Sequence, residues 1–254
     1  MKTKYKIVLI YDGSSFHGWQ RQTNTTETVQ EKVEKALAGI FKIEISTVGS
    51  GRTDAKVHSL NQHVVFDAPY FIEPTGLMKG LNSHLPVEIR CVDCEILNKD
   101  LMPTSDAKSR RYRYLFSTQE NETPFQRNYM AHFKYTLDFE AMREACEVFK
   151  GTHDFRSFMT AGSSPSTTVR EIFDVQLTKN TETFYGLFPE HYCFEIEATG
   201  FLKQMVRLIV GAIIEVGRGK LTSQDIEKSL KLADGNHIAA CAPPEGLCKA
   251  LVRY

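Results

Sequence analysis

One order of strands and helices occurs twice along this chain of 254 residues, and that repetition limits the folds open to it. In the first half, apolar and polar residues alternate as in strands, with helical periodicity between them. These strands are expected at 4–11, 43–49, 62–67 and 88–97, and the helices at 28–40 and 75–85. The second half is expected to have strands at 109–117, 171–178, 192–198 and 248–253, and helices at 139–150, 200–216 and 223–233.

A strand–helix–strand–strand–helix–strand order is typical of a ferredoxin-like unit. We therefore predict an α+β fold with two ferredoxin-like halves, residues 1–104 and 105–254. Their strands are expected to form one mixed, mostly antiparallel sheet with the helices packed on one side. Capping-box spacing, Thr28 with Glu31 and Thr222 with Asp225, supports two of the helix starts.

The charge balance of the chain is neutral, with 31 Lys and Arg residues against 31 Asp and Glu residues. Net charge therefore does not indicate a polyanionic partner, although a neutral protein can still carry a basic face. Two segments are locally basic, KSRRYRY at 108–114 and residues 203–220. No apolar run is long enough to cross a membrane and no signal peptide is visible, so we expect a cytoplasmic protein.

Neither the cysteines nor the short motifs of the sequence indicate a metal or a cofactor. Cys91 and Cys94 are the one close pair among six cysteines, and no second pair lies at the spacing of a zinc site. Buried thiols in a reducing compartment are the simpler interpretation. No P-loop, no GxGxxG motif and no nucleophile elbow is present, so the chemistry is expected to need only side chains and substrate.

The stretch GSGRTDAKVHS at 49–59 carries the strongest candidate for catalysis. Gly49 and Gly51 permit a sharp turn between two strands, and Arg52 and Asp54 follow from the same turn. A carboxylate beside an arginine stays ionised, which suits a nucleophile or a base. The same pattern also fits a surface turn with a local ion pair.

The strand RRYRY at 110–114 interleaves tyrosines with arginines. Strand alternation places Tyr112 and Tyr114 on one face, and Arg111 and Arg113 on the other. Such a strand can stack bases and hold phosphates, or it can be a half-buried strand with tyrosines in the core. In the expected helix 200–216, Arg207 lies in a narrow polar stripe, where it either reaches solvent or pairs with a carboxylate such as Asp54.

Several segments together resemble the tRNA pseudouridine synthase A family. They are YDGSSFHGWQRQ at 11–22, VQEKVEKAL at 29–37, GRTDAKVHS at 51–59, RRYRY at 110–114, GTHDFRSF at 151–158, FLKQMVRLIVGAIIEVGRG at 201–219 and APPEGLCKALVRY at 242–254. The matches span almost the whole chain in order, and GRTDA followed by VH is highly specific to that family.

This resemblance implies a homodimer with the pseudouridine synthase fold that isomerises uridine to pseudouridine in the anticodon stem-loop of tRNA, at positions 38–40. It implies no metal and no cofactor. Asp54 matches the catalytic aspartate, and Arg52 matches the arginine that expels and positions the target base. Tyr112 matches the tyrosine that stacks on the target uracil, and Arg207 matches the basic residue that pairs with the aspartate.

The sequence departs from the family pattern at a few positions. Lys56 stands where the family usually has glycine, Ser59 where it often has alanine, and Thr199 where it often has asparagine. The segment LMPTSDAKS at 101–109 replaces an aromatic and histidine-rich run. These departures concern substrate preference rather than the central chemistry.

Two other functions fit parts of the same pattern. A non-catalytic RNA-binding protein or tRNA chaperone would keep the basic face and the aromatics, but it would not need Asp54, because an acid near phosphates weakens binding. A hydrolytic nucleosidase would use a carboxylate as well, but it would activate water and release free base.

Overall fold

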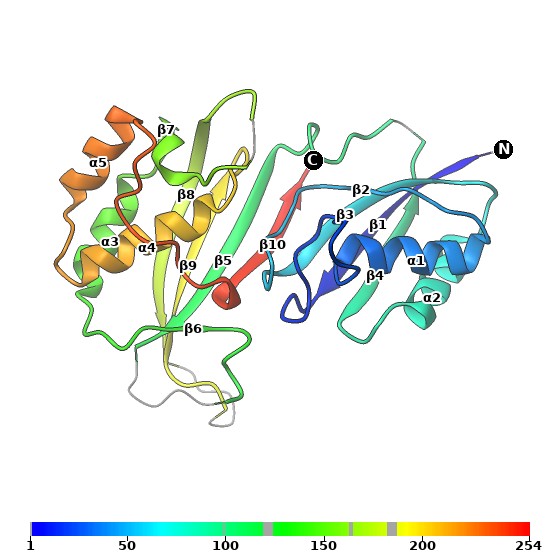
Figure 1. The fold of residues 1–254 in the computed structure, drawn as a ribbon, viewed down its shortest axis with the longest axis horizontal. Coiled ribbons are helices and arrows are strands. Elements are labelled where there is room, and N and C mark those ends of the chain that lie inside the picture. Colours follow the sequence, from blue (N-terminus) through cyan, green and yellow to red (C-terminus); the bar gives the residue numbers. More distant parts are fainter. Residues whose placement is uncertain (1, 99, 119–123, 163–164, 182–186) are drawn as a thin grey trace. The chain divides into compact units, whose positions relative to one another are not determined.

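The computed structural model describes residues 2–98, 100–118, 124–162, 165–181 and 187–254, and its ribbon is drawn in Figure 1. By their contacts the residues form two compact units, one of Met1–Lys108 with Cys248–Tyr254 and one of Ser109–Leu247. The sequence-based division placed residues 248–254 in the second half. They group with the first unit because the last strand pairs with a strand of that unit.

The first unit is a sheet with the strand order β4-β1-β3-β10 and two helices. Strand β1 (Thr3–Tyr11) runs antiparallel to β3 (His58–Ala68) and to β4 (Ile89–Ile96). The C-terminal strand β10 (Leu247–Arg253) runs parallel to β3, and the short β2 (Val48–Gly49) pairs with β3. The two helices are α1 (Val29–Phe41) and α2 (Pro74–His84).

One apolar core joins the helices to the sheet of this unit. Every second residue of β1 points into it, and so do the apolar stripes of α1 and α2. Its members include Tyr5, Ile7, Leu9, Val33, Leu37, Val64, Phe66, Leu77, Leu81 and Ile89. This packing leaves the loops at the strand ends to carry polar side chains on a rigid base.

The second unit has the strand order β5-β9-β8-β7, all antiparallel, with β6 beside β5. These strands are β5 (Ser109–Ser117), β6 (Ala131–His132), β7 (Gly151–Asp154), β8 (Val169–Asn180) and β9 (His191–Ala198). The helices are α3 (Phe139–Glu147), α4 (Met205–Gly217) and α5 (Ser223–Leu232), with short 3-10 helices η1 (Arg156–Phe158) and η2 (Pro244–Gly246). Helix α4 is buried over most of its circumference, as its apolar sequence predicts.

The predicted α+β class, a mixed and mostly antiparallel sheet with packed helices, is confirmed. The element bounds differ in places where backbone geometry overrides periodicity. The expected helix 200–216 begins only at Met205, because Gln204 has a left-handed backbone (φ 60°) that interrupts a helix. The expected strand 43–49 is reduced to β2, and β3 begins at His58, four residues earlier than the pattern predicts.

The two expected capping boxes form to different extents. Thr222 and Asp225 exchange both hydrogen bonds of the box. At α1, the Thr28 hydroxyl accepts from the Glu31 backbone N–H, but the Glu31 carboxylate instead pairs with Arg21 and Lys35. Among the described residues, no helix is long and apolar enough to cross a membrane, and no three side chains of the metal-binding types gather.

A buried histidine makes the stability of the first unit depend on pH. Burial, reinforced by Lys6 and Lys249, lowers the pKa of His63 from 6.5 to about 4. Its Nε2 bonds to Asn61, whereas Nδ1 has no hydrogen-bond partner among the described residues. In the folded protein, His63 therefore stays neutral down to about pH 4, whereas in the unfolded chain it takes up a proton below pH 6.5. Its contribution to the free energy of unfolding is full above pH 6.5 and is lost as the pH falls toward 4.

We predict that His63→Gln makes stability less sensitive to acid. Between pH 7 and pH 5, the wild type should lose roughly 2 kcal/mol of unfolding free energy through this one group. The His63→Gln variant should lose that much less, measured by urea unfolding at the two pH values. The exposed His17→Gln is the matched control, and equal pH dependence in both variants and the wild type would refute the prediction.

Candidate active site

Asp54 lies on the loop between β2 and β3, and the segment 12–19 holds this loop in place. The Trp19 backbone N–H donates to the Thr53 carbonyl (3.1 Å), and the Lys56 N–H donates to the Phe16 carbonyl (3.0 Å). These bonds lie on both sides of Asp54 in the sequence. The carboxylate is half-buried, and its backbone is fixed on each side by a neighbouring segment.

Two glycines allow the segment 12–19 to come this close. A Cβ atom on Gly13 would lie 2.1 Å from the Val57 carbonyl oxygen, and one on Gly18 would lie 2.6 Å from the Thr53 carbonyl oxygen. Gly18 also has φ 94°, which residues with a side chain rarely adopt. The motifs YDGSSFHGWQ and GRTDAKVHS are therefore two sides of one contact, which we name the Gly13–Gly18 clamp.

His58 closes the far end of the loop. The Gly13 N–H donates to its Nδ1 over 3.0 Å, so this nitrogen carries a lone pair and the ring proton is on Nε2. Asp12 Oδ1 lies 3.3 Å from the same Nδ1.

A buried lysine supports the loop from below. Lys249 of β10 has no exposed surface, and its Nζ donates to the Gly51 carbonyl (3.1 Å) and to Gln62 Oε1. The Gln62 amide donates to the same Gly51 carbonyl over 3.0 Å. Lys249 was not among the residues predicted from the sequence, although a lysine at an inward position of an alternating strand indicates a buried polar contact.

Arg52 and Asp54, which the sequence placed on one turn, do lie on one loop. The Arg52 side chain is exposed, so it can move without disturbing packing. Lys56, two residues after Asp54, has a left-handed backbone (φ 65°). That conformation explains why glycine suits this position in the family that the motifs resemble.

In the second unit, Tyr112 lies on the inner face of β5. Its ring meets Phe201 edge to face, with 5.1 Å between the ring centroids. The arginines on the opposite face are held by carboxylates of β9. Arg111 bonds to Glu197 (Nε–Oε2 2.8 Å) and to Glu195 (2.9 Å), and Arg113 pairs with Glu195. These ion pairs balance the charges of the two arginines and join β5 to β9.

Arg207 is fixed near the start of α4 by the segment before η2. Its Nε donates to the Ala242 carbonyl over 2.7 Å, and the Ala242 N–H donates to the Arg207 carbonyl over 3.0 Å. Gly211 lets this segment lie directly on the helix, since a Cβ there would be 2.0 Å from the Ala240 oxygen. Pro243, which follows Ala242, is held by Tyr114, whose hydroxyl donates to the Pro243 carbonyl (2.9 Å).

The four predicted site residues thus form two groups. Arg52 and Asp54 share the loop of the first unit, whereas Tyr112 and Arg207 belong to the second unit. The expected pairing of Asp54 with Arg207 stays a prediction.

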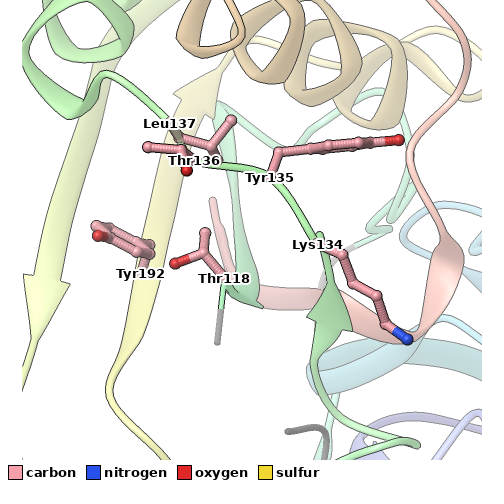
Figure 2. A pocket seen from close by; sticks show the side chains of 6 residues that line it. All are labelled: Thr118, Lys134, Tyr135, Thr136, Leu137 and Tyr192. Atoms are coloured by element: carbon pink, nitrogen blue, oxygen red, sulfur yellow. The ribbon is translucent and has the colours of Figure 1, made fainter. Parts of the chain in front are cut away.

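A cavity of about 520 Å³ in the second unit contains none of these four residues. It is lined by Thr118, Lys134, Tyr135, Thr136, Leu137 and Tyr192, as Figure 2 shows. Arg218 stacks on the Tyr135 ring at 3.9 Å. Among the described residues, no carboxylate lines the cavity, so none of these lining residues matches the nucleophile or base predicted for Asp54.

Comparison with known proteins identifies the family of the chain. A family model described as tRNA pseudouridine synthase matches residues 7–98 and 145–254, which include the Gly13–Gly18 clamp, Asp54 and Arg207. The chain belongs to this family. It is 37% identical to the tRNA pseudouridine synthase A of Ligilactobacillus salivarius over 100% of this chain and 97% of that protein. It is 38% identical to the tRNA pseudouridine synthase A of Thermoanaerobacter sp. (strain X514), over 98% of each.

Among solved structures, a Cbf5-Nop10-Gar1 complex is similar with a TM-score of 0.34 at 12% identity, over 83% of this chain and 45% of that chain. That likeness is too weak to support an argument. The predicted family is confirmed by the sequence matches, and with it the class of enzyme, an isomerase that converts uridine in tRNA. Tyr112 lies outside the residues that the family model matches.

Proposed function

We propose that this chain converts uridine to pseudouridine at positions 38–40 of the tRNA anticodon arm, with Asp54 as its catalytic carboxylate. The observation that carries the proposal is the way Asp54 is held. Two glycines, a buried lysine and several backbone hydrogen bonds fix one half-buried carboxylate in a loop. Such support is expected around a group that must meet a reacting atom accurately. A protein that only bound RNA would gain nothing from an acid there.

The target base has to leave its stack before a side chain can reach the sugar. Arg52 is exposed and lies two residues from Asp54, so it can occupy the space that the base leaves. Tyr112 offers the face on which the displaced uracil stacks. Arg207, held by Ala242, is the basic residue proposed to pair with Asp54.

The chemistry needs no oxidant and no second substrate. Asp54 attacks C1′ or removes the 2′ proton, and the bond between C1′ and N1 of uracil breaks with its electron pair going to the base. The base rotates and C5 bonds to C1′. The Asp54–C1′ bond breaks at this step in the first case, and the 2′ proton returns to C2′ in the second. The C5 proton is then released and N1 takes up a proton. The product is an isomer of the substrate, and side chains alone suffice. We further propose that the enzyme acts in the cytoplasm as a homodimer without metal or cofactor.

Tritium release tests this function. We expect the wild type to release tritium from a tRNA transcribed with 5-³H-uridine that has uridines at positions 38–40. A matched transcript with cytidine at those positions should release none. Equal release from both transcripts would refute the assigned positions, free uracil would indicate a nucleosidase, and binding without release would indicate an RNA-binding protein.

A further inference from the structure

A second group of charges lies at the start of β5, beside Tyr112, and the catalytic proposal does not use it. Arg110 is two residues before Tyr112 and therefore lies on the same face of the strand. Arg170 belongs to β8. A Cβ atom on Gly200 would be 3.7 Å from Arg110 Nη1 and 3.7 Å from Arg170 Nε, so the two guanidinium groups flank this glycine.

The backbone orients both arginines. Arg110 Nη1 donates to the Thr199 carbonyl over 2.7 Å. Arg170 Nη1 donates to the carbonyls of Thr167 (2.8 Å) and Val169 (2.6 Å). A guanidinium group has five N–H donors. Within the described residues these contacts of Arg170 use Nη1 alone, so its Nε and Nη2 donors remain for a ligand.

No carboxylate balances Arg170 in the part of the chain that the structure describes. Arg111 and Arg113, by contrast, are paired with Glu195 and Glu197 on the opposite face of the sheet. Burial and the neighbouring charge of Arg110 lower the pKa of Arg170. A phosphate matches the fork of a guanidinium group such as that of Arg170.

We propose that Arg170 and Arg110 together bind one backbone phosphate of the tRNA substrate, next to the target uridine. This inference rests on the proposed function, because Tyr112 lies on the same face and is the residue expected to stack on the flipped uracil. Both arginines are half-buried, so a phosphodiester can reach them while their stems stay packed. Gly200 leaves the space between them open.

The test is the salt dependence of tRNA binding by Arg170→Gln. Loss of one phosphate contact should weaken binding about tenfold and reduce the slope of log affinity against log salt concentration by about one. The factor should be the same for transcripts with uridine or cytidine at positions 38–40, because a phosphate contact reads no base. We expect KM for tRNA to rise, while kcat at saturating tRNA changes less than about twofold.

The matched control is Arg143→Gln in α3 of the same unit, an exposed arginine paired with Glu140. It removes the same charge and should leave the slope unchanged. Arg170→Lys keeps the positive charge and should keep the salt slope. It should bind tRNA less tightly than the wild type, because lysine lacks the forked donors of a guanidinium group. The double variant with Arg110→Gln should lose no more slope than Arg170→Gln alone, since one phosphate is shared.

The outcomes separate the two proposals. A wild type that releases no tritium would refute the proposed function. Normal release by the wild type, with an unchanged salt slope for Arg170→Gln, would overturn only the phosphate site. A fall in kcat and melting temperature without a change of slope would show that Arg170 has a structural role, and that result would also overturn the phosphate site.

Discussion

Asp54→Asn is expected to abolish tritium release from tRNA transcribed with 5-³H-uridine, with kcat lower by about 10⁴-fold or more. The amide has nearly the shape of the carboxylate, so the loop and its hydrogen bonds should persist. It has no negative charge, however, and can neither attack C1′ nor remove the 2′ proton. Binding of tRNA should be equal to that of the wild type or slightly tighter, because an acid is removed from the neighbourhood of phosphates.

Asp67→Asn provides the control, because it makes the same change at an exposed position of β3. It should release tritium at the wild-type rate. Substantial tritium release by Asp54→Asn would show that Asp54 is not the catalytic carboxylate, although the protein would still be an isomerase. A variant that lost both release and tRNA binding would point to a damaged fold, which the melting temperature would reveal.

Sequence periodicity predicted which side chains share a face, but it could not supply their partners. In RRYRY, alternation correctly separated Tyr112 and Tyr114 from Arg111 and Arg113. The ion pairs of these arginines depend on the register between β5 and β9, which are more than 70 residues apart in the sequence. No local pattern encodes that register.

The support of the loop that carries Asp54 was hidden for the same reason. Gly51 and Lys249 are brought together only because the last strand returns to pair with β3 in the first unit. The start of α4 was misplaced for another reason. An apolar run predicts burial and helical periodicity, but a single left-handed residue such as Gln204 leaves no trace in hydrophobicity. The catalytic candidates themselves came from motif resemblance, since spacing alone also fitted a surface turn.

Gly13→Ala should impair catalysis although residue 13 is not proposed to touch the substrate. The new Cβ would lie 2.1 Å from the carbonyl oxygen of Val57 and 2.5 Å from its carbonyl carbon, and a backbone group cannot rotate away as a side chain can. The loop with Asp54 must therefore shift. A displacement near 1 Å at a reacting group costs about 10²-fold in rate, and overpacking costs about 1–3 kcal/mol of stability. We expect kcat/KM to fall accordingly, measured by tritium release well below the melting temperature.

Gly76→Ala separates this effect from a general cost of replacing glycine. It lies in α2 of the same unit, where a Cβ would meet only Ile72 at 3.8 Å, and alanine favours a helix by about 1 kcal/mol. It should keep full activity and gain stability. If Gly13→Ala were less stable but as active as Gly76→Ala, the clamp would serve folding alone. Lower activity in the folded enzyme would mean that the close contact at Gly13 holds Asp54 in position for the reaction.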